Sequence, residues 1–174
     1  MTITLREGGP DDLPVLLGML DSSVEWLVAQ GRTAQWGTRP LSRSEGTVAA
    51  VTRAMAEGTT YLAEVDGAPA ATLTLTDGPG AYLSHLPAPG EPERYIHWLA
   101  SDRRFKGLGA GSALLAHAAE ETRRAGVGLL RVDCYAGGDR RLVAYYEANG
   151  FTPTHTYTHG PDDWPGQVLA RRVR

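Results

Sequence analysis

The sequence predicts an α/β (α+β) fold in which strands and helices alternate along one domain, residues 1–174. Short stretches rich in aromatic and β-branched residues alternate with longer stretches whose apolar residues recur at helical spacing. A glycine-rich segment separates one such strand from the helix that follows it. Neither a linker nor an internal repeat divides the 174 residues, a length that can bury a sizeable core.

The N-terminal part predicts one strand and two helices. Residues 3–6 are expected to form the strand, and a long helix follows up to Gly31. Asp11 is the expected cap, because an aspartate side chain accepts hydrogen bonds from the free amides of a first helical turn. Leucines recur along one side of this helix, and the opposite side is apolar too. That second side is expected to pack in the core, to form a homodimer contact or to line a ligand pocket. The second helix is expected near residues 44–57.

The middle of the chain predicts a hairpin followed by a loop. Strands are expected at residues 59–65 and 70–76, joined by Asp66-Gly67, a dipeptide typical of tight hairpin turns. Residues 79–93 are rich in proline and glycine and are expected to form a mobile loop.

The C-terminal half predicts alternating strands and helices. Asp139 is the expected cap of the last helix, which Asn149-Gly150 ends. The expected order over the whole chain is strand, two helices, three strands, helix, strand, helix and two strands. The expected strands of this half are residues 95–99, 129–135, 152–158 and 167–172, and the expected helices lie near residues 112–125 and 140–148.

Composition argues against several function classes. The net charge is −3 and the basic residues are scattered, so nucleic acid is not an expected ligand. No apolar run approaches the roughly 20 residues of a membrane span, and the N-terminal residues lack the pattern of a signal peptide. The single cysteine, Cys134, cannot form an internal disulfide and fits a cytoplasmic location. The histidines have no partners at metal-ligand spacing, so no metal is expected.

The residues from Arg104 to Gly111 predict a phosphate-binding loop. Glycines at alternate positions let the backbone approach a ligand and turn its N–H groups toward it. The helix that follows offers free amides and a partial positive charge in its first turn, and Arg104 and Lys106 add full charges. The spacing fits neither a P-loop nor the dinucleotide-binding fingerprint. The alternative is a tight turn with solvated basic side chains.

Two segments resemble the GNAT family of acetyl-CoA-dependent N-acetyltransferases. The run Arg-x-x-Gly-x-Gly that begins at Arg104 is similar to the pyrophosphate loop of that family. The run from Asp139 to Phe151 is similar to the family segment Asn-x-x-Ala-x-x-x-Tyr-Glu-x-x-Gly-Phe, with Tyr146 and Glu147 at the matching positions. Asp139 stands where the family usually has asparagine.

The resemblance implies a fold and an activity. The fold would be a mixed, mostly antiparallel central sheet of about seven strands flanked by about four helices. The activity would be transfer of an acetyl group from acetyl-CoA to a primary amine of a small molecule by direct attack. A domain that binds acyl-CoA without turnover, as a sensor or scaffold, is one alternative. A protein or peptide N-acetyltransferase is another.

The resemblance also implies residue roles on the cofactor side. The backbone of Leu99 and Ala100 would face the pantetheine arm. Tyr146 would donate a proton to the leaving thiol, although two core tyrosines with satisfied hydroxyls would give the same pattern. Asp139 would contact the cofactor or only cap its helix. The residues expected to hold the pyrophosphate are Arg104, Phe105, Lys106, Gly107, Leu108, Gly109, Ala110 and Gly111.

The sequence says less about the residues that bind the acceptor amine and remove its proton. His97 is the first candidate for the general base, because it titrates in the right range and would share a strand face with Leu99. Glu25 is a second candidate, and proton removal through ordered water would need neither. Trp26 and Trp36 are expected either to contact the acceptor, since a tryptophan face attracts a cation, or to pack in the core.

Overall fold

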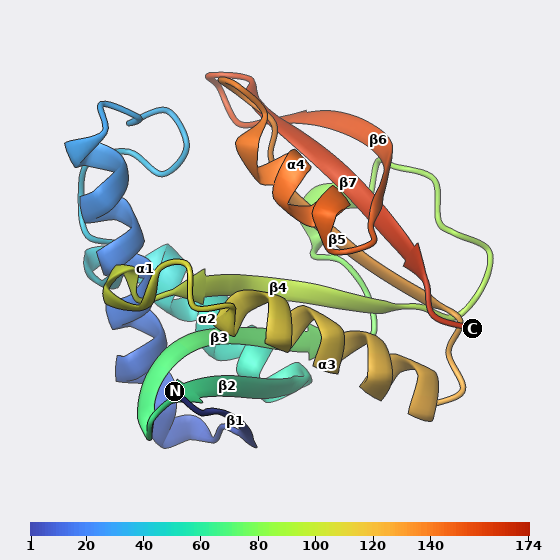
Figure 1. The fold of residues 1–174 in the computed structure, drawn as a ribbon. Helices are drawn as coiled ribbons and strands as arrows, with labels where there is room; N and C mark the ends of the chain where they lie inside the picture. The colour runs from blue at the N-terminus through green and yellow to red at the C-terminus, as the bar shows by residue number, and fades with distance from the viewer. The chain divides into compact units, whose positions relative to one another are not determined.

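The computed structural model describes residues 1–174 and confirms the expected order of helices and strands (Figure 1). One seven-stranded sheet has the order β1-β2-β3-β4-β5-β7-β6. The β4–β5 pair is parallel, whereas the pairs β1–β2, β2–β3, β5–β7 and β6–β7 are antiparallel, so the sheet is mixed and mostly antiparallel as expected. The elements are β1 (Ile3–Glu7), α1 (Leu13–Ala29), α2 (Glu45–Glu57), β2 (Thr59–Val65), β3 (Ala68–Thr76), β4 (Arg94–Ser101), α3 (Ala110–Arg124), β5 (Leu129–Tyr135), α4 (Arg141–Ala148), β6 (Thr152–His159) and β7 (Trp164–Arg172).

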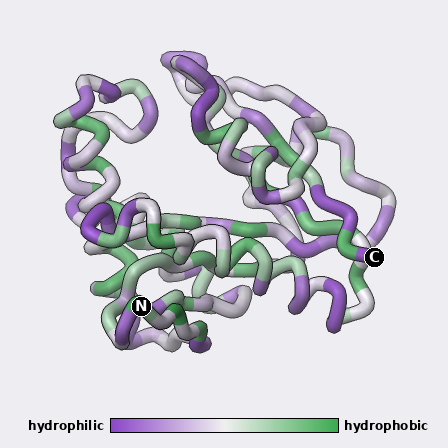
Figure 2. Tube along the Cα trace, viewed as in Figure 1, coloured by the Kyte–Doolittle hydropathy of each residue, from purple (hydrophilic) through white to green (hydrophobic).

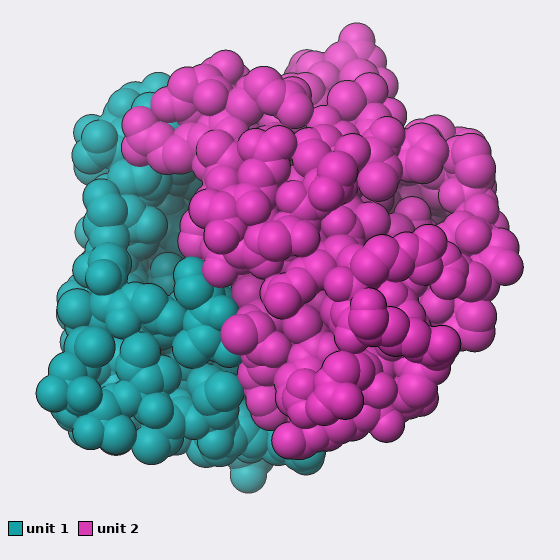
Figure 3. All heavy atoms as spheres, turned by 45° about the vertical axis from the view of Figure 1, so that its right-hand side comes forward, with its two compact units in different colours: residues 1–76, 97–114 teal, residues 77–96, 115–174 magenta.

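The chain divides into two compact units, which Figure 3 shows in different colours. Unit 1 comprises Met1–Thr76 and His97–Leu114, and unit 2 comprises Asp77–Ile96 and Leu115–Arg174. Each unit is therefore built from two separate stretches of the chain, and β4 and α3 contribute residues to both. No helix combines the length and the apolar character that a membrane crossing requires.

The core of unit 1 forms where α1 and α2 pack on the sheet. Its members are apolar and at most 6% exposed, because the leucine stripe of α1 faces inward. Hydrogen bonds from the Ser42 amide and hydroxyl to the Asp21 carboxylate tie the loop between the two helices to the middle of α1. The core residues are Leu16, Met19, Leu20, Val51, Leu62 and Ala100.

The core of unit 2 is more aromatic. Tyr95 and Tyr157 pack with Leu83 and Val168, and α4 packs against β5 and β6. The last turn of α3 is strongly hydrophilic (Figure 2) and carries an ion pair between Glu120 and Arg124.

Three expectations from the sequence need correction: the start of the first long helix, its capping residue and the start of the last strand. The long helix begins at Leu13 after a 3-10 turn, and Asp12 rather than Asp11 makes the local hydrogen bond, accepting from the Gly9 amide. The last strand begins at Trp164, three residues before the expected start at residue 167.

The loop expected to be mobile is fixed at two points. It contains a 3-10 turn, η3 (Ala81–Leu83), whose Tyr82 donates a hydrogen bond to Asp133 of β5. At its end, Glu93 forms a buried, bidentate ion pair with Arg131. Its proline and glycine content therefore marks an irregular path, while two polar contacts that are distant in sequence hold it in place.

Candidate active site

The loop between β4 and α3 turns twice through left-handed backbone conformations. Gly107 has φ 80° and Gly109 has φ 86°, values that residues with a Cβ rarely adopt. The two turns lead directly into α3, whose Ala113 amide donates to the Gly109 carbonyl. The glycine spacing noted in the sequence thus has a conformational cause.

These turns leave a row of amide N–H groups without acceptors. The amides of Gly107, Gly109, Ala110, Gly111 and Ser112 donate to no group of the protein. The last three belong to the first turn of α3, where the helix dipole adds partial positive charge. A Cβ placed on Gly107 or Gly109 would meet no atom within 4 Å, so the space in front of the row is open. The loop therefore has the donors and the room to receive an anion.

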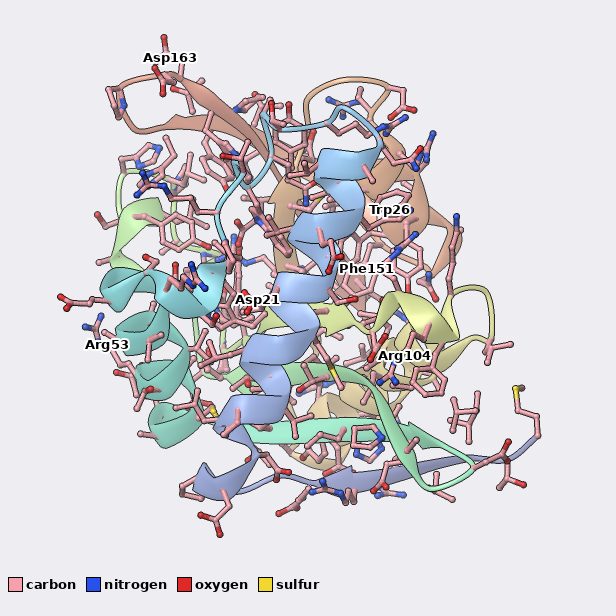
Figure 4. All side chains as sticks on the ribbon, turned by 90° about the vertical axis from the view of Figure 1, so that its left-hand side faces the viewer. Asp21, Trp26, Arg53, Arg104, Phe151 and Asp163 are labelled. Atoms are coloured by element: carbon pink, nitrogen blue, oxygen red, sulfur yellow. The ribbon has the colours of Figure 1, made fainter.

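The basic side chains of the loop have partners within unit 1. Arg104 was expected to face the phosphate, but its guanidinium chelates Asp102, with a shortest distance of 2.7 Å. This contact lowers the pKa of the Asp102 carboxyl. Figure 4 labels Arg104 on this loop and Trp26 on the C-terminal half of α1. The guanidinium of Arg103 lies 3.7 Å from the centre of the Trp26 ring, and the ammonium of Lys106 lies 5.4 Å from it.

Trp26 therefore has a different environment from the one expected. The sequence predicted a cation over its ring, and the structure supplies that cation from the protein's own loop. The face under Arg103 is consequently not free for an acceptor. The Arg103 amide also donates to the Ser22 hydroxyl, at 3.1 Å, so α1 holds the start of the loop through a hydrogen bond and a cation–π contact.

Arg103 carries the one buried side-chain polar atom that lacks a partner. Its Nε has no hydrogen-bond acceptor, and burial lowers the pKa of the guanidinium. An unsatisfied buried donor costs about 1–3 kcal/mol, so an acceptor oxygen brought to this atom would be stabilising. The sequence motif begins one residue later, at Arg104, and gave no signal for Arg103.

The strand that precedes the loop is irregular at Trp98. Its φ of 54° interrupts the extended conformation in the middle of β4. The expectation that His97 and Leu99 share a face assumed regular alternation, and this assumption fails at the residue between them. Trp98 and Ala100 pack against the core of unit 1.

The other two residues that the sequence predicted on the acceptor side are Glu25 and Trp36. Glu25 is exposed on α1 and has no partner. Trp36 packs against the core cluster of unit 1, as the alternative expectation had it.

In unit 2, Tyr146 is a buried tyrosine whose hydroxyl oxygen is not fully enclosed by the protein. The residue is 5% exposed, and its ring packs edge-on against Tyr145 and Phe151. No group of the protein hydrogen-bonds to its hydroxyl. Burial, followed by the neighbouring Cys134, raises the pKa of Tyr146 well above its ordinary value, so the phenol keeps its proton. Without a partner in the protein, this hydroxyl differs from the satisfied core hydroxyl of the alternative expectation, and its role as a proton donor stays a prediction.

Three other tyrosines of unit 2 share one acceptor. The Asp133 carboxylate accepts hydrogen bonds from Tyr82, Tyr95 and Tyr157 at 2.5–2.7 Å. No local pattern could have shown this cluster, because its members come from four separate segments.

At the start of α4, Asp139 stands where the family usually has asparagine, and its contacts are with neighbouring residues. The Asp139 carboxylate accepts a hydrogen bond from the Arg141 amide at 3.1 Å and pairs with the Arg141 guanidinium. Arg140 lies between them in a left-handed conformation, φ 57°. Asp139 therefore satisfies the first amide of the helix, although it lies one residue before the cap position, which Arg140 occupies.

Comparison with known proteins decides the family. The family model described as the acetyltransferase (GNAT) family matches residues 23–151, about three quarters of the chain. The chain belongs to the GNAT family. It is therefore an acyltransferase by family membership, in agreement with the two motifs. No curated protein matches the chain closely enough to count as a relative.

Solved structures support the same fold. YncA from Salmonella typhimurium, solved with its cofactor acetyl-CoA, has a TM-score of 0.65 at 14% identity, over 100% of this chain and 95% of that one. A protein assigned, without proof, as a phosphinothricin N-acetyltransferase has a TM-score of 0.71 at 19% identity, over 99% of both chains. The ribosomal-protein-alanine N-acetyltransferase from Brucella melitensis has a TM-score of 0.66 at 20% identity, over 97% and 99%. At these identities the likeness concerns the fold alone.

The family leaves open whether the acetyl group passes through a cysteine of the protein. Cys134 is the single cysteine, and it is buried on β5 beside Tyr146. Burial raises the pKa of its thiol to about 12. A thiol with that pKa is almost never a thiolate at neutral pH, and the thiolate is the nucleophile.

No group of three or more His, Cys, Asp or Glu side chains is placed to hold a metal ion.

We expect Cys134 to resist alkylation in the folded protein. At pH 8 its thiolate fraction would be roughly a thousandfold below that of an exposed cysteine. Iodoacetamide labelling followed by mass spectrometry should therefore be slower by at least this factor in buffer than in concentrated urea. Equal rates in the two solvents would show that the thiol is accessible and ionised.

Proposed function

We propose that this GNAT enzyme transfers the acetyl group of acetyl-CoA to a primary amine of a small molecule by direct attack. The observation that carries the proposal is the group of unpaired amides at Gly107 and from Gly109 to Ser112. These donors, the positive end of α3 and the open space before the two glycines suit a diphosphate, which is the anionic centre of coenzyme A.

The chain's own residues fit that group in two further ways. The orphaned Nε of Arg103 would gain an acceptor if a phosphate oxygen came within reach. Lys106 contributes a positive charge on the same loop. In contrast, Arg104 is neutralised by Asp102, so its contribution to binding would be smaller than the motif alone implies.

Tyr146 is the proposed general acid. Bound acetyl-CoA would supply an activated acyl group whose departing sulfur needs a proton. Tyr146 keeps its proton because burial raises its pKa, and its hydroxyl has no competing partner in the protein. A phenol with a raised pKa transfers its proton uphill to a thiolate, so the transfer would accompany bond cleavage rather than precede it.

Direct attack follows from the state of the single cysteine. An acyl-enzyme route would need a nucleophile, and the raised pKa of Cys134 makes that thiol unsuitable. The amine would therefore attack the thioester itself. His97, Glu25 or ordered water would remove the amine's proton, as the sequence suggested.

The chemical class of the acceptor is the most detailed part of the proposal. The solved neighbours include proteins named for a small-molecule acceptor and for a ribosomal protein, so acetylation of a protein amine is the second candidate. A cytoplasmic location and a homodimer remain predictions from the sequence.

We expect Gly109→Val to abolish tight binding of coenzyme A. A side chain at this position both strains the left-handed backbone, by about 1–2 kcal/mol, and fills the space before the amides. Gly67→Val is the matched control, because Gly67 has φ 83° and open space but lies in the β2–β3 hairpin. Calorimetry should give a Kd at least tenfold weaker for Gly109→Val and unchanged for Gly67→Val, with similar losses of stability in urea. Unchanged affinity in Gly109→Val would refute the role of the loop.

We expect Tyr146→Phe to lower kcat while leaving the affinity for coenzyme A unchanged. The variant keeps the ring packing and removes only the proton donor, a contribution typically worth about 10²-fold or more. Tyr145→Phe, the same change on the neighbouring ring, should alter kcat little. The proposed role fails if Tyr146→Phe lowers kcat less than about threefold at every pH from 6 to 10. A protein that binds coenzyme A but releases none with any amine would be the sensor or scaffold of the alternative reading.

A further inference from the structure

The carboxylate of Asp133 is an anion without a cation. Its three hydrogen bonds all come from neutral phenols, and it forms no ion pair. Burial and the charge of Asp133 raise the pKa of each of the three tyrosines, so all of them remain donors. By contrast, the buried carboxylate of Glu93 is neutralised by a bidentate ion pair with Arg131. The three tyrosine hydroxyls thus stabilise the negative charge of Asp133, but no cation neutralises it.

One acceptor position on this carboxylate remains open. A carboxylate offers about four lone-pair positions on its two oxygens. Oδ1 accepts from Tyr82 and Tyr95, whereas Oδ2 accepts from Tyr157 alone. Asp133 is half-buried and Tyr82 is 38% exposed, so the cluster is not sealed from solvent. A ligand N–H could therefore reach the free position on Oδ2.

Aromatic side chains flank this carboxylate, because Tyr82 and Tyr157 donate to it. The ring of Tyr82 lies 6.2 Å from that of Tyr157 and 5.8 Å from that of His159, and Trp164 lies 6.4 Å from Tyr157. Aromatic faces attract cations, most strongly when water is excluded. A carboxylate with aromatic walls is chemically suited to an ammonium group and poorly suited to an anion.

An ammonium held by Asp133 cannot be the amine that is acetylated. A neighbouring carboxylate favours the charged form and raises the pKa of an amine, whereas attack on a thioester needs a neutral nitrogen. An ammonium bound here would thus belong to a second amino group of the same substrate.

Resting on the proposed function, we propose that Asp133, walled by Tyr82 and Tyr157, binds a distal ammonium group of the acetyl acceptor. The acceptor is accordingly a small molecule with two or more amino groups, one bound as a cation and the other acetylated.

The test compares α,ω-diaminoalkanes of three to eight carbons with 1-aminoalkanes of the same lengths. The wild-type enzyme should favour the best diamine over its monoamine by at least tenfold in kcat/KM. Asp133→Asn, which keeps the shape and removes the charge, should abolish this preference mainly by raising KM. Asp163→Asn is the matched control, because Asp163 is exposed in the β6–β7 turn at φ 50°, a conformation that asparagine adopts readily (Figure 4). It should keep the preference.

A second measurement separates this proposal from the proposed function. The melting temperature of wild-type protein without acetyl-CoA should rise with the diamines but not with the monoamines, and Asp133→Asn should lose that response. This result would support the ammonium site even if no amine were acetylated. The ammonium site is refuted if the wild type treats diamines and monoamines alike in both measurements. It is also refuted if a folded Asp133→Asn retains the preference, which would leave the cluster a purely structural one.

Discussion

The row of unpaired amides at the start of α3 is the feature on which the functional account depends. Five amides, those of Gly107 and of the residues from Gly109 to Ser112, have no acceptor in the protein, because two left-handed glycines turn the backbone just before the helix begins. The first-turn amides of a helix have no intrahelical acceptor, so water or a ligand receives them. The loop is also held from below, since Arg103 and Lys106 lie over Trp26 and the Arg103 amide donates to Ser22. A rigid support of this kind reduces the ordering that binding would require.

Unit 2 uses its tyrosine hydroxyls in two distinct ways. Three of them converge on Asp133 and tie η3, β4, β5 and β6 together. The hydroxyl of Tyr146 joins no such network, although the residue is as buried as Tyr157. The same side chain thus serves as a satisfied donor in one place and as an available donor in the other. This contrast is the structural reason for proposing Tyr146, rather than another tyrosine of unit 2, as the proton donor.

Most of the fold and the left-handed turns of the loop between β4 and α3 could be predicted from the sequence, because local physics determines them. The Asp66-Gly67 turn, the apolar stripe of α1 and the alternate glycines each act within a few residues. The errors concern contacts between distant segments. Prolines around residues 79–93 gave no sign that Tyr82 and Glu93 would anchor the loop.

The acceptor side shows the same limit. Trp26 was expected to attract a cation, and no local signal showed that Arg103 would occupy its face. The cluster around Asp133 left no sequence signal, because its three donors come from segments up to 51 residues away in the chain. The argument for His97 depended on strand alternation, which the positive φ of Trp98 interrupts. Such features arise from the tertiary structure and leave no periodicity in the sequence.

The most direct test of the account is an NMR titration that follows the backbone amides of the loop. Addition of coenzyme A should shift the amide resonances of Gly107, Gly109, Ala110 and Gly111 and slow their exchange with solvent, since these N–H groups would gain phosphate acceptors. Pantetheine, which lacks the diphosphate, should leave them unchanged. Binding of coenzyme A with these four amides unperturbed would contradict the central claim.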